Sequence, residues 1–332
     1  MAETFCYLLG AGASCNVLPV NENFPEKMDQ FLSDYNKFRE DVNRQKPSDP
    51  KISTEPLKYE EHFKQSMTWL MTEAKNHVSV DTFAKMLYLT NDFNGLNRLK
   101  ATLATYLVMA QAMHGTDLRY DGFFATILQY SGSIGTPVIP DHIRIITWNY
   151  DIQLEKGFYR YLKNVKEDTR KFQLYNTFNR NPHIKRINGL AWVPMPTYPK
   201  RDQYAEAALR PLSIDTVLIA LERYSTFKAN AAEFHFDIQF AWEQDREQFE
   251  SSMTPAIKDT TILIDIGYSF PFFDREIDRI LLNCMSNLKK IYIQVKKPDH
   301  DEIKDRLQSI LSPLPKVEYV FDEKRFKIPY EL

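Results

Sequence analysis

Several residue types and patterns are scarce in this chain, and each scarcity excludes a class of protein. The three cysteines, Cys6, Cys15 and Cys284, form no CxxC pair, so we expect neither a zinc ribbon nor a disulfide framework, and we predict no metal site. No apolar run reaches the roughly 18 residues that a membrane span needs. The formal net charge of −2 favours neither nucleic acid nor an anionic membrane as a partner. Together these absences are typical of a protein of a reducing, cytoplasmic environment.

The remaining composition is that of a soluble globular protein. Hydrophobic residues make up 43% and charged residues 26% of the 332 residues. This length suits one large domain or two small ones. Because the chain enters the apolar segment TFCYLL almost at once and has no basic leader, we expect a first strand there and not a signal peptide.

Short apolar runs rich in β-branched and aromatic residues predict five strands. Nearly unbroken runs of this kind are typical of strands that are buried on both faces of a parallel sheet. The runs lie at residues 4–9, 143–147, 261–266, 290–295 and 317–321. Amphipathic helical patterns separate them. This alternation predicts an α/β fold, Rossmann-like and doubly wound, with a mainly parallel sheet.

Helical patterns alone fill residues 55–131, which predicts a helical subdomain inserted into this fold and packed on it. Its two apolar stripes, which we interpret as core, are Phe63, Met67, Leu70, Met71 and Ala74, and Leu96, Leu99, Leu103, Leu107 and Ala110. A second helix-rich segment covers 203–256, and residues 40–55 are expected to form a polar loop. The Rossmann-type domain then comprises residues 1–40 and 132–332.

Glycine is rare, at 10 of 332 residues, and several glycines fall in short motifs at expected strand ends. In LLGAGAS, Gly10 permits a tight turn and Gly12 lets backbone amides approach a pyrophosphate, while Ser14 adds a hydroxyl donor. A Gly-x-Gly after a strand often makes only a turn. The motif therefore leaves a nucleotide loop and a structural turn as two interpretations.

Two further motifs place polar residues directly after expected strands. In ITWNYD, Asn149 and Asp151 are alternate residues and can point into one pocket at the carboxyl end of the strand. Asp151 can equally cap the following helix. In IGYSF, Gly267 allows close approach and Ser269 can donate to a ribose or phosphate. For Asp274, a little further on, we favour the role of a helix cap.

The joint order of GAGAS, TWNYD, a later glycine and GYS resembles the sirtuin-like SIR2 family. The similarity is closest to the SIR2-like domains of prokaryotic antiviral defence, which consume NAD, and it spans most of the chain. The resemblance implies NAD as substrate or ligand, with its pyrophosphate held by Gly10, Ala11, Gly12 and Ser14.

The same resemblance implies roles for the other motif residues. Asn149 would position the nicotinamide ribose or a water molecule, and Asp151 would hold the carboxamide. Gly267 and Ser269 would contact phosphate and ribose. Lys296 lies near the place where the family binds adenosine, but it matches no motif well.

The chain departs from the family at two places. Residues 190–266 contain no cysteine, so the zinc ribbon of protein-deacetylating sirtuins is missing, which argues against protein deacylation. The segment RINGLAW, ending at Trp192, stands where the family has a pattern close to KLHGSxNW, so Asn188 occupies the place of the catalytic histidine. Histidine accepts a proton near neutral pH, whereas an asparagine amide only hydrogen-bonds. His183 is a candidate substitute base if the local backbone bends inward, but we favour the interpretation of an ordinary surface or core histidine.

Two functions follow as hypotheses. In the first, the protein is an NAD⁺ glycohydrolase of antiphage defence that yields nicotinamide and ADP-ribose and is triggered by a protein partner or by homo-oligomerisation. In the second, Asn188 leaves a catalytically impaired module that binds NAD or ADP-ribose as a sensor or an assembly subunit. A simple α/β domain whose nucleotide pocket has decayed is a third interpretation.

Residues 160–186 form a locally basic stretch, in which eight basic residues are opposed only by Glu167 and Asp168. Such a stretch can face a phosphate, a nucleic acid or an acidic partner. A solvated face is the simpler interpretation, and we favour it.

Overall fold

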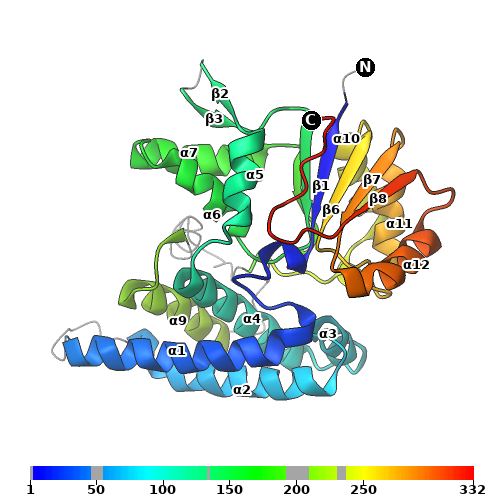
Figure 1. The fold of residues 1–332 in the computed structure, drawn as a ribbon. Helices are drawn as coiled ribbons and strands as arrows, with labels where there is room; N and C mark the ends of the chain where they lie inside the picture. Colours follow the sequence, from blue (N-terminus) through cyan, green and yellow to red (C-terminus); the bar gives the residue numbers. More distant parts are fainter. Residues whose placement is uncertain (1–2, 46–54, 133–134, 192–208, 230–236) are drawn as a thin grey trace.

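Six parallel strands form the central sheet of the computed structural model, which describes residues 3–45, 55–132, 135–191, 209–229 and 237–332 (Figure 1). The strands are β1 (Phe5–Leu9), β4 (Ile143–Thr147), β5 (Ile184–Arg186), β6 (Ile262–Ile266), β7 (Lys290–Gln294) and β8 (Lys316–Val320). Their spatial order is β5-β4-β1-β6-β7-β8, and every neighbouring pair is parallel. In chain order this is the 3-2-1-4-5-6 arrangement of Rossmann folds.

The predicted fold class is therefore confirmed, and each of the five predicted strands ends within one residue of its predicted bounds. The sequence analysis missed β5, which has only three residues at the sheet edge, and the small hairpin of β2 (Gln129–Ser131) and β3 (Thr136–Val138). The winding direction reverses between β1 and β6. Ligands of doubly wound sheets bind at this switch point, beyond the carboxyl ends of the strands.

Helices cover both faces of the sheet because successive strand residues point to opposite sides. The odd-numbered residues of β1 pack with α5 (Arg119–Ile127) and α6 (Gln153–Tyr159) in one apolar cluster. Its even-numbered residues pack with α10 (Arg246–Ile257), α11 (Arg275–Cys284) and α12 (His300–Ile310) in another. Another short helix, α7 (Glu167–Tyr175), follows α6. Figure 1 shows the sheet between these two sets of helices.

A separate helical layer lies across the end of the sheet towards which β1 runs (Figure 1). It has an apolar core of its own and consists of α1 (Phe24–Gln45), α2 (Glu60–Asn76), α3 (Val80–Leu89), α4 (Phe93–His114) and α9 (Ile214–Ala229). The two predicted core stripes lie on α2 and α4. Only α2 to α4 come from the predicted insertion, and three separate stretches of chain therefore build this layer.

The predicted polar loop at residues 40–55 is wrong at its start, because α1 remains helical through Gln45. The last turn of α1 is polar, but it contains good helix formers, and Arg44 pairs with Asp41 at 3.4 Å. The first proline after the start of the helix is Pro47, beyond its end. Residues 46–54, Trp192 and parts of the second helix-rich segment lie outside the described residues. In that part of the chain which the structure describes, no helix is both long and apolar enough to cross a membrane.

Several side chains of the basic stretch 160–186 have partners within the chain. Arg160 pairs with Asp121 at 3.6 Å, and Arg186 pairs with Glu155. The Arg170 guanidinium donates to the Tyr159 hydroxyl at 2.6 Å. These intramolecular contacts account for part of the local positive charge and agree with a structural, solvated face.

Candidate functional site

The loops that follow β1 and β6 touch through their glycines. The Gly12 amide donates to the Gly267 carbonyl at 3.0 Å, and a Cβ on Gly12 would lie 2.7 Å from the Gly267 Cα. A Cβ on Gly10 would lie 2.4 Å from the Cα of Tyr268. Gly267 itself has a φ of +67°, a region that favours glycine. These glycines therefore make a backbone-to-backbone contact at the switch point, which supports the structural interpretation of Gly-x-Gly, whatever ligand lies beside it.

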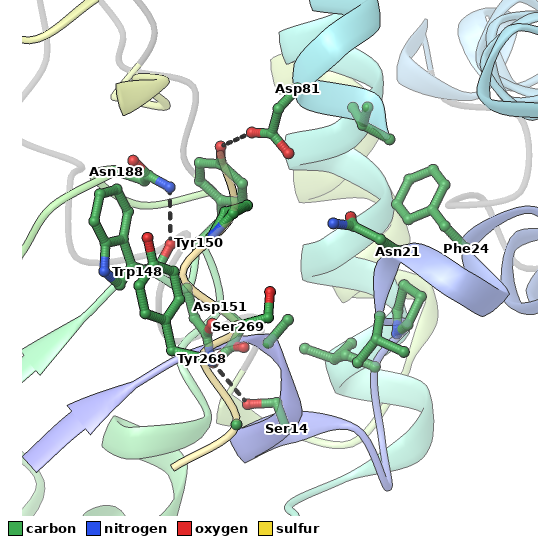
Figure 2. Close-up of a pocket in the computed structure, with 18 of the residues that line it drawn as sticks. Ser14, Asn21, Phe24, Asp81, Trp148, Tyr150, Asp151, Asn188, Tyr268 and Ser269 are labelled. Atoms are coloured by element: carbon green, nitrogen blue, oxygen red, sulfur yellow. Dashed lines mark hydrogen bonds between the residues drawn. The ribbon is translucent and has the colours of Figure 1, made fainter. Parts of the chain in front are cut away.

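An open cleft lies directly above this contact, between the strand ends and the helical layer (Figure 2). Its empty space, including the solvent-filled mouth, is about 960 Å³. Seven of the nine predicted site residues line it, namely Ala11, Ser14, Asn149, Asp151, Asn188, Gly267 and Ser269. The other two, Gly10 and Gly12, lie behind Gly267 and Tyr268. The structure thus gathers four motifs from distant parts of the chain at one place.

Asn149 ties the loop after β4 to the loop after β1. Its side chain is 7% exposed, and its Nδ2 donates to the Gly10 carbonyl at 2.9 Å and lies 3.5 Å from the Ser14 hydroxyl. Its backbone amide donates to the Thr147 hydroxyl at 3.0 Å. The Asn149 side chain is therefore held in one orientation at the floor of the cleft.

Asp151 combines the two interpretations that its sequence position allows. Its Oδ1 accepts from the Gln153 amide at 2.9 Å, which stabilises the start of α6 in the manner of a cap, although Ile152 is the residue that precedes the helix. The same side chain lines the cleft. Burial raises the pKa of Asp151 to about 6, against the lowering effect of the Gln153 amide and the Ser14 hydroxyl.

Asn188 lies in the wall of the cleft, where the family resemblance places a histidine. Its Nδ2 donates to the Trp148 carbonyl at 3.1 Å, and its buried Oδ1 has no hydrogen-bond partner among the described residues. Its carbonyl accepts from the Gln239 amide at 2.9 Å. The next residue, Gly189, has a φ of +73°, and a Cβ there would lie 1.7 Å from the Asp237 carbonyl oxygen. The loop is thus locked against residues 237–239.

The two other candidates from the sequence lie outside the cleft. His183 precedes β5 at the amino end of the sheet, where its carbonyl accepts from the Ile145 amide at 2.9 Å, so it cannot act as a substitute base. Lys296 follows β7 and reaches to within 3.9 Å of Glu22 at the surface. Neither residue is among those that line the cleft.

Aromatic side chains form one wall of the cleft. The Trp148 and Tyr268 rings are stacked, with centroids 5.0 Å apart and an interplanar angle of 9°. Tyr150 stands beside them in Figure 2. Asp274 occupies the cap position of α11 but makes no cap hydrogen bond, so the expected capping role is wrong. Its Oδ2 instead accepts from the Tyr268 hydroxyl at 3.1 Å, because the side chain turns towards the cleft.

The helical layer contributes lining residues that the sequence analysis missed. Asp81 on α3 faces the cleft, with its Oδ1 accepting from the Tyr150 hydroxyl at 3.3 Å. The other missed contributors of the layer and its entry loop include Asn21, Phe24, Val80, Leu103 and Leu107. In the sequence, Asp81 has the position of an ordinary first-turn acid, since Ser79 caps the same helix. Nothing in the neighbouring sequence distinguishes a first-turn acid of this kind from a residue that lines a binding site.

The chemistry of the lining is acidic. It includes three aspartates and no lysine, arginine or histidine among the described residues. These residues also contain no group of three or more histidine, cysteine or acidic side chains arranged to hold a metal ion. Comparisons with protein-family models, curated proteins and solved structures find no match to this chain.

Proposed function

We propose that the cleft binds NAD and that the protein is a slow NAD⁺ glycohydrolase, acting in prokaryotic antiphage defence. The observation that carries the binding proposal is the convergence of Ser14, Asn149, Asp151, Asn188 and Ser269 at the switch point of a Rossmann-type sheet. The assignment to defence rests on the motif resemblance alone.

The lining suggests how the ligand would lie. The Ser14 and Ser269 hydroxyls, beside the glycine contact, would meet the phosphates and a ribose. Asn149, Asp151 and Asn188 would surround the nicotinamide riboside. The buried Oδ1 of Asn188 has no hydrogen-bond partner among the described residues, which supports a ligand that brings a donor to this wall, such as a ribose hydroxyl or the carboxamide.

Hydrolysis at this place needs little from the protein besides orientation. The bond between C1′ and the nicotinamide nitrogen breaks, the ring takes the electron pair and leaves as neutral nicotinamide, and a water oxygen bonds to C1′. The water's second proton passes to solvent. Because Asn188 cannot accept that proton, we expect a rate lower by the factor of about 10²–10⁴ that a general base contributes.

A second function, NAD or ADP-ribose binding without turnover, is favoured by the same residue. Asn188 keeps hydrogen-bonding capacity in the place of a base. In that case the protein would serve as a sensor or as an assembly subunit within a defence complex, and a protein partner or a second copy would read the bound state.

Nicotinamide release and calorimetry on the purified chain separate these functions. A glycohydrolase releases nicotinamide, and Asn149→Ala abolishes the release, whereas Asn36→Ala, at an exposed position on α1, leaves it unchanged. ADP-ribose binding without any release supports the binding module. Absence of both binding and release would contradict the NAD proposal altogether.

A further inference from the structure

Two buried carboxyl groups lie behind the aromatic wall that Trp148 and Tyr268 form, and the proposed reaction does not use them. Asp265 on β6 and Asp278 on α11 have no exposed surface, and neither lines the cleft. Burial raises the pKa of each well above its usual range, and no basic side chain among the described residues lowers it. Buried acids without a cation cost stability, which is typical of residues that serve a site.

Both carboxyl groups contact the same residue of the wall, Tyr268. The Tyr268 amide donates to the Asp265 Oδ1 at 3.1 Å, and the Tyr268 hydroxyl lies 3.0 Å from the Asp278 Oδ1. The hydroxyl also lies 3.1 Å from the Oδ2 of Asp274, at the start of α11. Tyr268 is therefore held both at its backbone and at the far end of its ring.

The proton count at the hydroxyl indicates which group donates. The Tyr268 hydroxyl has a single proton, so it cannot donate to Asp274 and Asp278 at once. Because Asp278 is fully buried and its pKa is raised, Asp278 keeps its own proton and donates to the hydroxyl oxygen. Tyr268 then donates to Asp274, which lines the cleft. In this arrangement Asp278 is neutral, and an asparagine amide can make the same donation.

The ring of Tyr268 orients the rest of the wall. It stacks on the Trp148 indole with centroids 5.0 Å apart and an interplanar angle of 9°, and it packs edge-on against Phe270. The buried Trp148 Nε1 has no hydrogen-bond partner among the described residues, so packing alone orients the indole. The Trp148 carbonyl accepts from the Asn188 Nδ2 at 3.1 Å, and Figure 2 shows these three residues on one side of the cleft. The orientation of the wall therefore depends on the hydrogen bonds of one hydroxyl.

We propose that Asp278 is a positioning residue of the cleft, which holds the Tyr268 hydroxyl and so fixes the wall on which the nicotinamide ring packs. This inference rests on the proposed function, in which the nicotinamide riboside would lie beside Asn188, and it gives a role to a residue outside the cleft. Asp265 supports the same tyrosine through its amide. A flat ring gains affinity from an aromatic face that is already oriented before the ligand binds.

Leucine and asparagine at position 278 separate the hydrogen bond from the space that the side chain fills. Asp278→Leu cannot bond the hydroxyl, whereas Asp278→Asn can donate to it as the protonated acid does. We expect Asp278→Leu to lose the near-ultraviolet circular dichroism signal that Trp148→Phe removes. Calorimetry should show NAD⁺ affinity lower by on the order of tenfold and the affinity for ADP-ribose, which lacks the ring, changed by less than about threefold.

Asp278→Asn should keep both the Trp148 signal and the NAD⁺ affinity, and Asp29→Leu, at an exposed position on α1, is the control. Tyr268→Phe is the second variant, because it keeps the ring and removes only the hydroxyl. It should reproduce the losses of Asp278→Leu. The double variant should lose no more than either single variant, since both remove the same hydrogen bond. If Asp278→Leu does not fold, Tyr268→Phe carries the test.

The possible failures are distinguishable. An unchanged Trp148 signal in Tyr268→Phe overturns the positioning role, and so does an unchanged NAD⁺ affinity in a variant that has lost this signal. Equal losses in Asp278→Asn and Asp278→Leu overturn the assignment of a neutral hydrogen bond. If the wild-type protein binds neither NAD⁺ nor ADP-ribose, the proposed function fails, and the circular dichroism of the variants then decides alone whether Asp278 positions the wall.

Discussion

Gly12 and Gly267 meet backbone to backbone at the switch point of the sheet, with the Gly12 amide donating to the Gly267 carbonyl at 3.0 Å. This contact joins the ends of β1 and β6, which are paired in register from Phe5 with Ile262 to Leu9 with Ile266. The floor of the cleft is therefore a direct continuation of the two central strands, and side chains from both loops are placed relative to each other by the sheet itself.

Substitution of either glycine should destabilise the protein. A Cβ on Gly267 would lie 2.5 Å from the Gly12 Cα, and the φ of +67° adds strain for any other residue. We expect Gly267→Ala to lower the free energy of unfolding by roughly 2–4 kcal/mol, measured by urea denaturation.

Gly122 on α5 provides the matched control, because a Cβ there meets nothing within 4 Å. Gly122→Ala should stabilise the helix by about 0.5–1 kcal/mol. If Gly267→Ala and Gly122→Ala changed the free energy of unfolding equally, the backbone contact between Gly12 and Gly267 would not be closely packed.

Stability should fall as the pH rises through the acidic range and beyond neutrality. Burial raises the pKa of Asp81 to about 6 and that of Asp274 to about 8, against an ordinary value near 3.8. The folded state thus holds protons that the unfolded state has already released, so the free energy of unfolding decreases between about pH 4 and pH 8. Urea denaturation across this range measures the decrease.

Replacing Asp274 by a neutral residue should remove part of this loss of stability at high pH. We expect Asp274→Asn to stabilise the protein at about pH 8.5 by roughly 1–3 kcal/mol and to flatten the pH dependence. A buried carboxyl group that makes the protein less stable than its asparagine variant is typical of residues that serve binding or catalysis. A loss of stability in Asp274→Asn at this pH would mean that the carboxylate has a structural partner.

The sheet and the floor of the cleft were predictable because their signals are local. Each predicted strand is a continuous apolar run, and Asn149, Asp151 and Ser269 stand two to four residues after such a run. Doubly wound folds place these positions at one edge, so short motifs sufficed to predict their meeting.

The helical side of the cleft was not predictable in this way. Asp81 reaches the cleft only because α3 packs on α4 and the whole layer covers the strand ends. The residues around Asp81 in the sequence indicate the start of a helix, but they do not indicate which surface that helix packs on. Likewise, the side chain of Asp274 accepts from the Tyr268 hydroxyl and does not cap the helix. This contact depends on the position of the Tyr268 ring, which stacks on Trp148 with a centroid distance of 5.0 Å. Such contacts follow from tertiary structure.

The substitution Asn188→His tests whether residue 188 lies at the reacting centre. Asn188 lines the cleft, and its Nδ2 already reaches the Trp148 carbonyl, so an imidazole can use the same acceptor through one nitrogen and face the cleft with the other. If the cleft cleaves NAD⁺, a histidine there should take up the proton of the attacking water or of a ribose hydroxyl. We expect nicotinamide release to increase by about 10²-fold or more and to show a new dependence on a group that titrates near pH 6.5. His183, at the amino end of β5 and outside the cleft, is the matched control, and His183→Asn should leave the rate of Asn188→His unchanged. An unaltered rate in Asn188→His, with NAD binding retained, would instead favour the module that binds without turnover.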